Sequence, residues 1–242
     1  MEELEYKKMF EIENNHWWFI AKRKLIKILF KRFLQNIESK DLKSLDVGCG
    51  TGAVLKFLQD ASYKAKGIDF SDTALRYCKS RGLDVQYGIA TKIPMPDNSF
   101  DIITALDVVE HIEDDKNVIK ELYRVLKPGG ICIITVPAHM WLWSYHDVSL
   151  HHKRRYSKNS LKQLANLVSQ DFFISWFHMF ILIPVTFVRF FGKLLKNNKS
   201  DVGKSSWLVN FVMSIVYFFE LGLFSLFGRI PFGTSLVLVI KK

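Results

Sequence analysis

Apolar and polar positions follow two different periods along this chain, and the changes between them mark its elements. Short apolar runs rich in Val, Ile and Leu alternate with segments of helical spacing. The predicted strands are residues 43–50, 63–70, 83–88, 100–107, 131–138, 172–180 and 235–242. The predicted helices between them are residues 53–62, 71–82, 112–130 and 157–170. This alternation predicts an α/β fold, with a doubly wound, mostly parallel sheet and helices on both faces.

Residues 16–37, ahead of the first strand, predict an amphipathic basic helix. Ile26, Leu29, Phe33 and Ile37 recur at helical spacing. Six cations accompany them without an acid: Lys22, Arg23, Lys24, Lys27, Lys31 and Arg32. Two interpretations stay open, a solvated face above a core-facing stripe, or a face for an anionic surface such as a membrane.

Residues 181–231 interrupt the alternation with two apolar stretches around a polar loop. Pro184 breaks the first stretch, and the second, Trp207–Phe227, is long enough to span a bilayer. Glu220 lies deep in this second stretch, where a lipid-exposed charge would be costly. We therefore expect a hairpin that lies in the membrane interface or buries itself on the protein. A dimer interface and a hydrophobic lid over the active site are the alternatives.

The charge balance locates a basic excess outside the alternating region. The chain has 34 Lys and Arg against 24 Asp and Glu, a net charge of +10, and 49% of its residues are apolar. This composition excludes a disordered chain and is too charged for a polytopic transporter. The excess lies mainly at 22–32, 153–158 and 189–204. It points to an anionic surface or acceptor more than to nucleic acid.

Cysteine content and the N-terminal residues indicate a cytoplasmic location. Three widely spaced cysteines without a CxxC motif predict neither a disulfide framework nor a cysteine-based zinc site. The first residues, MEELEYKK, contain no early apolar run, so we expect no secretory signal.

A glycine-rich turn follows the first predicted strand. Residues 46–52 read DVGCGTG and lead into a helix, and glycines there let the backbone turn tightly and approach a ligand. Asp69 closes the second strand, where an acid can accept hydrogen bonds from both ribose hydroxyls. These features predict a nucleoside-bearing ligand at this end of the sheet.

Four segments in order resemble the motifs of class I S-adenosylmethionine-dependent methyltransferases: DVGCGTG, GIDFS, IPMPDNSFDIITALDVVEHI and RVLKPGGICIITVP. The resemblance implies a seven-stranded sheet of order 3-2-1-4-5-7-6 with an antiparallel seventh strand. Residues 1–40 would then be N-terminal lid helices, and 41–180 with 232–242 the Rossmann-like core. Residues 181–231 would be a hydrophobic helical insertion between strands six and seven.

The same resemblance implies a site for S-adenosylmethionine, with S-adenosylhomocysteine as product. Glycines of the turn would line the methionine and ribose, Asp46 would face the amino group, and Phe70 would pack on the adenine. Ile89 stands where many relatives have an Asp, so the adenine contact would come from backbone groups nearby. The implied cofactor residues are Asp46, Gly48, Cys49, Gly50, Gly52, Asp69, Phe70, Ala90, Thr91 and Leu106.

The predicted acceptor side begins directly after the fourth strand. Asp107, Glu110, His111 and the later His152 resemble the E-x-x-E-H metal site of plant small-RNA 2′-O-methyltransferases and the similar motif of ubiquinone O-methyltransferases. They are the candidate catalytic residues, as a general base with its positioning groups or as ligands of a divalent metal. A purely structural role is the third interpretation.

HWWF at residues 16–19, HHKRRYS at 151–157 and IPFG at 230–233 resemble segments of bacterial and archaeal methyltransferases linked to cell-surface glycan or lipid pathways. This resemblance implies six acceptor-binding residues: Trp17, Trp18, Arg23, His146, Arg154 and Arg155. The arginines would meet a carboxylate, a phosphate or an acidic membrane. Packing and solvated surface are the alternative roles.

These features favour O-methylation of a small-molecule or lipid-linked acceptor, such as a glycan, an isoprenoid or a phosphate-bearing lipid. We expect a cytoplasmic protein in peripheral contact with the membrane, with no nucleic-acid partner and with a homodimer as one use of the apolar insertion. The alternatives are a metal-dependent RNA 2′-O-methyltransferase and a non-catalytic S-adenosylmethionine-binding scaffold.

Overall fold

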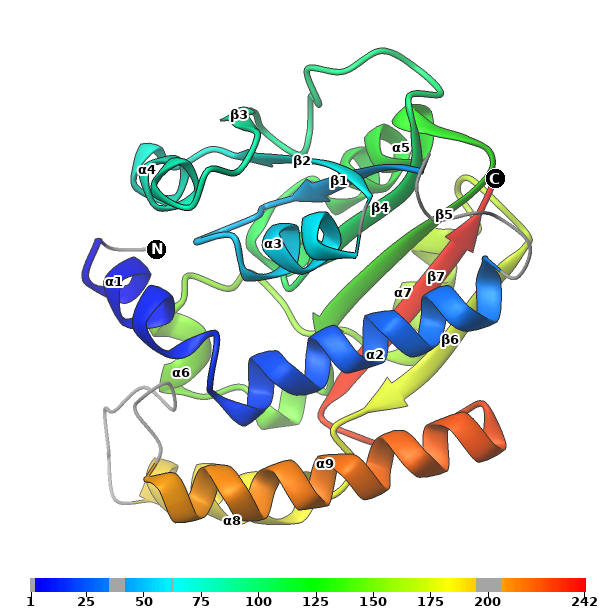
Figure 1. The fold of residues 1–242 in the computed structure, drawn as a ribbon. Helices are drawn as coiled ribbons and strands as arrows, with labels where there is room; N and C mark the ends of the chain where they lie inside the picture. The colour runs from blue at the N-terminus through cyan, green and yellow to red at the C-terminus, as the bar shows by residue number, and fades with distance from the viewer. Residues whose placement is uncertain (1–2, 35–41, 62, 195–205) are drawn as a thin grey trace.

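A computed structural model describes residues 3–34, 42–61, 63–194 and 206–242, so Ile37 and much of the predicted polar loop lie outside the described residues. It contains one seven-stranded sheet of order β3-β2-β1-β4-β5-β7-β6 (Figure 1). The strands are β1 (Lys43–Val47), β2 (Lys64–Asp69), β3 (Val85–Tyr87), β4 (Phe100–Leu106), β5 (Leu126–Pro137), β6 (Phe172–Phe177) and β7 (Ser235–Lys241). β7 pairs antiparallel with both neighbours, which confirms the predicted order and direction.

Helices cover both faces of this sheet. α5 (Asp115–Val125) and α7 (Lys158–Ala165) pack on one face. α2 (Trp17–Phe33), α3 (Ala53–Asp60) and α9 (Trp207–Phe227) pack on the other. The remaining described helices are α1 (Glu3–Ile12), α4 (Asp72–Ser80), α6 (Tyr145–Ser149) and α8 (Leu182–Leu194), with short 3₁₀ turns at Val109–His111 and Met140–Leu142.

The central strands are apolar at consecutive positions because both of their faces are buried. Ile103 of β4 and Ile134 of β5 belong to the core cluster under α5 and α7. Their neighbours Ile102 and Ile133 belong to the cluster under α2 and α9. Side chains of a strand point alternately to opposite faces, so each strand contributes to two cores.

Two of the predictions that the structure corrects involve a proline. The helix predicted over 112–130 ends at Val125, and Leu126 already begins β5, because Pro128 lacks an N–H and disfavours helix before it. Pro184 does not break the first apolar stretch. α8 begins at Leu182, so Pro184 lies in the first turn, where its missing N–H costs no helical hydrogen bond.

The apolar insertion has a buried side, which packs on the helical layer over the sheet, and an exposed side at the surface. α9 lies beside α2 (Figure 1), and Tyr217, Leu221 and Phe224 are buried in the core beneath them. The outer faces of α8 and α9 are exposed. Their exposed large apolar residues are Ile183, Phe187, Val188, Phe190, Trp207, Leu208, Val209, Phe211, Val212, Ile215, Phe218, Phe219, Leu226 and Phe227. We call this set the apolar face.

Candidate active site

The glycine turn between β1 and α3 has the backbone geometry that its sequence predicts. Gly48, Gly50 and Gly52 have φ values of +69°, +55° and +96°. A Cβ on Gly48 would lie 2.5 Å from Cγ2 of Val108, so this position requires glycine for space as well as for conformation. The turn thereby brings backbone N–H groups to the carboxyl end of the sheet.

Two buried acids flank the glycine turn. Asp69 accepts hydrogen bonds from the N–H groups of Gly50 and Ser71, both at 2.9 Å. Burial raises the pKa of Asp69, and these N–H donors oppose the rise. Asp46 accepts a hydrogen bond from the Thr104 hydroxyl at 2.6 Å, and burial raises its pKa to about 7. The carboxylate of Asp69 thus braces the turn and retains lone pairs for a ligand.

The other predicted cofactor residues surround the same turn. Phe70, directly after β2, is 62% exposed and presents a ring at the surface. The Asn117 side-chain amide donates to the carbonyl oxygen of Thr91 at 2.7 Å, which fixes the backbone beside buried Ala90. Leu106 packs into the core cluster under α2. The thiol of Cys49 is buried, 3.9 Å from Sγ of Cys78, so only the backbone of Cys49 is left to meet a ligand.

Helix α1 covers the glycine turn, a contact for which no sequence motif gave a residue-level signal. The methyl group of Met9 lies 2.9 Å from where a Cβ on Gly50 would be, and Tyr6 is buried. Glu13, just after α1, forms a buried ion pair with Arg81 at 2.6 Å. Arg23 donates to the carbonyl oxygen of Glu13 at 2.9 Å. Arg23 thus holds the residues after α1 through backbone contacts, and its contact with an acceptor anion stays a prediction.

Asp107 follows β4 in a left-handed conformation, with φ of +54°. Its carboxylate pairs with Lys22 of α2 and accepts a hydrogen bond from the Thr135 hydroxyl at 2.8 Å. Lys22 is buried, although the sequence placed it on the charged face of the helix. Asp107 is therefore engaged by the lid helix and does not join the group of potential metal donors that contains Glu110.

Glu110, His111 and His152 do come together. Their donor atoms lie within 4.8 Å of one another. Glu110 is fully buried, and neither of its carboxyl oxygens has a hydrogen-bond partner among the described residues. Burial, together with nearby His152, lowers the pKa of His111 to about 4. Two imidazoles and one unpaired carboxyl group form a donor set that fits a divalent transition-metal ion.

Asp147 orients the ring of His152 through a contact with Nδ1. Its carboxylate lies 2.9 Å from Nδ1 of His152 and accepts a hydrogen bond from Nε of Arg155 at 2.7 Å. Arg155 is buried and also donates to the carbonyl oxygen of Ala138 at 2.9 Å. The guanidinium of Arg155 is thus enclosed and holds Asp147, and an acceptor contact for Arg155 stays a prediction. No sequence motif singled out Asp147.

Two of the predicted acceptor residues, Arg154 and His146, lie around this group. Arg154 pairs with Asp115 at 2.9 Å, at the start of α5. The ring of His146 lies 6.3 Å from that of His152. His146 is therefore near the candidate catalytic group, whereas the guanidinium of Arg154 is engaged by an acid of the protein itself.

The two predicted acceptor tryptophans lie on the lid helix and face the insertion. Trp17 stacks on Tyr217 of α9, with ring centroids 5.1 Å apart. Trp18 stacks on His178, directly after β6, at 3.9 Å. Both tryptophans thus pack the lid helix against the insertion and the end of β6.

Three strands on one side of the sheet are followed by a residue with positive φ. Asp107 follows β4, His139 comes soon after β5 and His178 follows β6, with φ values of +54°, +63° and +65°. Non-glycine residues rarely adopt this conformation, and they gather at functional sites. The three strained ends make the β4–β6 side of the sheet the candidate acceptor side.

Comparison with known proteins gives a family for the central part of the chain. A family model described as a methyltransferase domain matches residues 45–134. This segment therefore belongs to the class I S-adenosylmethionine-dependent methyltransferases, and S-adenosylmethionine is the cofactor of that class. The matched residues run from the glycine turn through Glu110 to β5.

Two curated relatives act in quinone pathways by their names. A demethylmenaquinone methyltransferase of Geobacillus stearothermophilus is 35% identical over 119 residues, which cover 45% of this chain and 51% of the relative. A ubiquinone biosynthesis O-methyltransferase of Methylococcus capsulatus is 36% identical over 95 residues, which cover 36% of this chain and 40% of the relative. The chain thus spans about half or less of the length of these two relatives.

A solved structure extends the similarity of fold to most of the chain. The crystal structure of an S-adenosylmethionine-dependent methyltransferase from Archaeoglobus fulgidus aligns with a TM-score of 0.57 at 20% identity. The alignment covers 91% of this chain and 94% of that one. At this identity the similarity establishes the fold alone.

Proposed function

We propose that the protein transfers a methyl group from S-adenosylmethionine to an oxygen of a small acceptor held at a membrane, and that the acceptor is a reduced quinone. The observation that carries the proposal is the oriented His152–Asp147 pair beside Glu110 and His111, at the strand ends next to the glycine turn. The two quinone-pathway relatives support this acceptor class.

The proposed chemistry is an in-line displacement at the sulfonium methyl group. The acceptor oxygen forms a bond to the methyl carbon while the carbon–sulfur bond breaks, leaving neutral S-adenosylhomocysteine. His152 takes the proton of the acceptor hydroxyl, and Asp147 at its Nδ1 stabilises the resulting imidazolium. His111, with its pKa lowered to about 4, stays neutral and accepts hydrogen bonds. The protein's main contributions are alignment and proton removal.

The donor atoms of Glu110, His111 and His152, within 4.8 Å of one another, also support binding of a divalent ion. When bound, such an ion would polarise the acceptor oxygen and lower the pKa of its hydroxyl. Asp147 would then fix the metal-facing orientation of His152 rather than stabilise its protonated form. Activity after chelation, and after return of Mn²⁺ or Mg²⁺, separates the two roles of this group.

The apolar face supports peripheral membrane contact on the cytoplasmic side. Among the described residues, only α9 is long and apolar enough to span a bilayer, and Glu220 ties it to the protein. Exposed Lys24, Lys27 and Lys31 lie on the neighbouring α2. Apolar surface beside cations suits anionic lipid. A homodimer through the same face is the competing arrangement.

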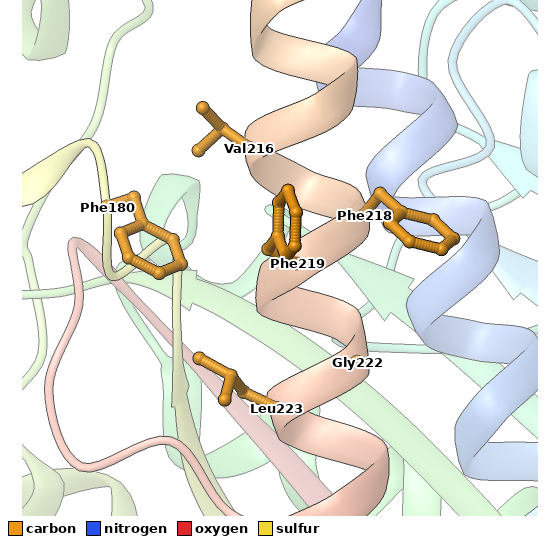
Figure 2. Close-up of a pocket in the computed structure, with 6 residues that line it drawn as sticks. All are labelled: Phe180, Val216, Phe218, Phe219, Gly222 and Leu223. Atoms are coloured by element: carbon orange, nitrogen blue, oxygen red, sulfur yellow. The ribbon is translucent and has the colours of Figure 1, made fainter.

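A hollow of about 460 Å³ opens on the apolar face between α9 and the residues after β6. Phe180 and Phe219 lie on its two sides, with Gly222 and Leu223 at one end (Figure 2). Its lining is almost wholly apolar, which suits a hydrocarbon chain more than RNA. This favours a lipid acceptor over the RNA 2′-O-methyltransferase alternative, and the oriented His152–Asp147 pair favours catalysis over a non-catalytic scaffold.

The test uses labelled S-adenosylmethionine and anionic vesicles that contain reduced demethylmenaquinone. We expect label in the lipid fraction, in a product whose fragmentation places the methyl group on oxygen. A methyl group on ring carbon would contradict the O-transfer, and label in added RNA would revive the alternative. S-adenosylhomocysteine binding without transfer to any acceptor tested would contradict the enzymatic proposal.

A further inference from the structure

His178, directly after β6, is a buried histidine, and one of its two ring nitrogens lacks a hydrogen-bond partner among the described residues. Its side chain is fully buried and its backbone has φ of +65°. Nδ1 hydrogen bonds with the hydroxyl group of Tyr217, while Nε2 has no partner among the described residues. Leaving a buried polar atom unpaired costs free energy, so a ligand that pairs with it gains affinity.

The insertion holds this histidine in place through two side chains of α9. Tyr217 fixes the ring, and the carboxylate of Glu220 accepts hydrogen bonds from the backbone N–H groups of His178 and Met179, at 2.6 Å and 3.1 Å. Tyr217 and Glu220 are themselves buried. α9 therefore stabilises the strained end of β6, in addition to carrying part of the apolar face.

His178 is also connected to the acceptor side of the sheet. Trp18 of the lid helix stacks on its ring at 3.9 Å, and Nζ of Lys22 lies 5.1 Å from the centre of the Trp18 ring. Lys22 in turn pairs with Asp107 at the end of β4. The charge of Lys22 acts on the pKa of both Glu110 and His178. Lys22 thus contacts both Asp107, at the end of β4, and Trp18, which stacks on His178.

We propose that His178 binds a second oxygen of the acceptor through Nε2, while the first oxygen is methylated beside Glu110, His111 and His152. This inference rests on the proposed function and narrows its substrate class to small acceptors with two oxygens, such as a hydroquinone. With the Tyr217 hydroxyl donating to Nδ1, the ring carries its proton on Nε2 and donates it to the acceptor oxygen. Tyr217 is then a positioning residue, and the insertion helps to define acceptor choice.

The experiment compares two probes and two variants in the presence of S-adenosylhomocysteine. The probes are 1,4-dihydroxynaphthalene and 1-naphthol, which differ in the second oxygen, and their Kd values are measured by titration. The longer side chain of Gln can place its donating amide nitrogen at the position of Nε2, whereas the shorter side chain of Asn reaches only the position of Nδ1, where its amide oxygen can accept from Tyr217. His178→Gln therefore keeps the proposed contact, and His178→Asn keeps only the contact with Tyr217.

Wild-type protein is expected to prefer the diol over 1-naphthol by about tenfold, the gain of one hydrogen bond to a buried group. His178→Asn should remove this preference, and His178→Gln should retain most of it. The Kd of S-adenosylhomocysteine should stay unchanged in both variants. If His178 has only a structural role, the opposite result is expected. His178→Asn would then bind both probes as the wild type does, and His178→Gln would weaken the binding of both probes equally.

Three outcomes would overturn the proposal: equal affinity of the wild type for the two probes, no binding of either probe, or a preference that His178→Asn leaves intact. Thermal unfolding of each variant shows whether it folds. If a variant does not fold, NMR of ¹⁵N-histidine-labelled wild-type protein takes its place. The resonance of His178 Nε2 should then shift when the diol is added and stay unchanged when 1-naphthol is added. An unshifted resonance with bound diol overturns the proposal as well. Failure of the proposed function is distinct, since it appears as missing methyl transfer while probe binding persists.

Discussion

Two regions at the carboxyl edge of the sheet, one over β1–β2 and one over β4–β6, are built by different kinds of contact. We call them the β1–β2 end and the β4–β6 end. At β1–β2 one carboxylate holds the backbone of the glycine turn: Asp69 accepts hydrogen bonds from the N–H group of Gly50, 19 residues away, and from that of Ser71, two residues away. At β4–β6 the contacts join distant segments through side chains, as in Lys22 with Asp107. The first end is a local motif, and the second is assembled by the lid and the insertion.

This difference predicts which region determines cofactor binding and which determines acceptor choice. A ligand site made from one turn and one strand end binds the same group wherever that motif occurs. A site made from α2, α9 and the residues after β5 changes with each of these additions. We therefore expect substitutions at the β1–β2 end to affect cofactor affinity, and those at the β4–β6 end to affect turnover and acceptor choice.

The largest expected effect is the loss of His152 at the acceptor end. His152→Ala should lower kcat by about 10²–10⁴-fold, the usual contribution of a general base, without changing the affinity for S-adenosylhomocysteine. The neighbouring exposed His151 gives the control, as His151→Asn, because Asn tolerates its φ of +58°. A loss of S-adenosylhomocysteine affinity in His152→Ala as large as the loss in kcat would contradict the proposal that the two ends have separate roles.

Removal of Asp69 tests the cofactor end. Asp69→Ala should weaken S-adenosylhomocysteine binding by about 100-fold, since it removes the two backbone contacts and the ribose contacts of a charged group. Calorimetric titration measures the effect. Asp60→Ala, at an exposed acid at the end of α3, is the matched control. Retained affinity in Asp69→Ala would refute the role assigned to this carboxylate.

The buried state of His111 predicts a pH dependence of stability. Its pKa of about 4 in the folded protein lies below the usual value near 6.5, so the unfolded chain takes up a proton that the folded protein does not. The free energy of unfolding should therefore fall by about 2 kcal/mol as the pH drops from about 7 to about 5, relative to His111→Asn.

The comparison with His111→Asn is needed because other groups titrate in the same range. The pKa of Asp46 is raised to about 7 by burial, which gives the opposite pH dependence. Urea unfolding of both proteins at several pH values measures the difference between them. Parallel stability curves for the wild type and His111→Asn would show that His111 is accessible to protons in the folded state.

The smallest expected effect concerns the apolar face. The double substitution Phe218→Glu with Phe219→Glu should weaken binding to anionic vesicles by about tenfold, because two exposed rings of α9 no longer enter the interface. Leu167→Glu, at an exposed leucine after α7, controls for the added charge. Sedimentation with vesicles measures the binding. Unchanged vesicle binding together with loss of a dimer would assign the face to a second copy.

The fold and the cofactor end could be predicted from the sequence because their signals are local. Apolar runs predicted the alternating strands and helices, and the resemblance carried by four motifs implied the strand order of the sheet, which the structure confirms. Asp46, Gly48, Gly50, Gly52 and Asp69 lie together around one turn, as the resemblance implied. Positive φ at the glycines follows from glycine chemistry itself.

The acceptor end could be predicted only in part. Glu110, His111 and His152 come together, but Asp107 does not join them, since buried Lys22 competes for its carboxylate. Helical periodicity placed Lys22 among solvated cations and could not show that a distant acid draws it inward. Asp147 lies only five residues before His152, but its local signal, the Ser144–Asp147 capping box, predicts the start of a helix and not a partner for a histidine.

The role of the insertion is tested most directly by one ratio in the Phe218→Glu, Phe219→Glu variant: methylation of reduced demethylmenaquinone in anionic vesicles divided by methylation of soluble 1,4-dihydroxynaphthalene. We expect this ratio to fall by about tenfold relative to the wild type, with soluble turnover and S-adenosylhomocysteine affinity unchanged. An unchanged ratio, with both activities retained or lost together, would contradict the claim that the insertion brings the catalytic end to a membrane-held acceptor.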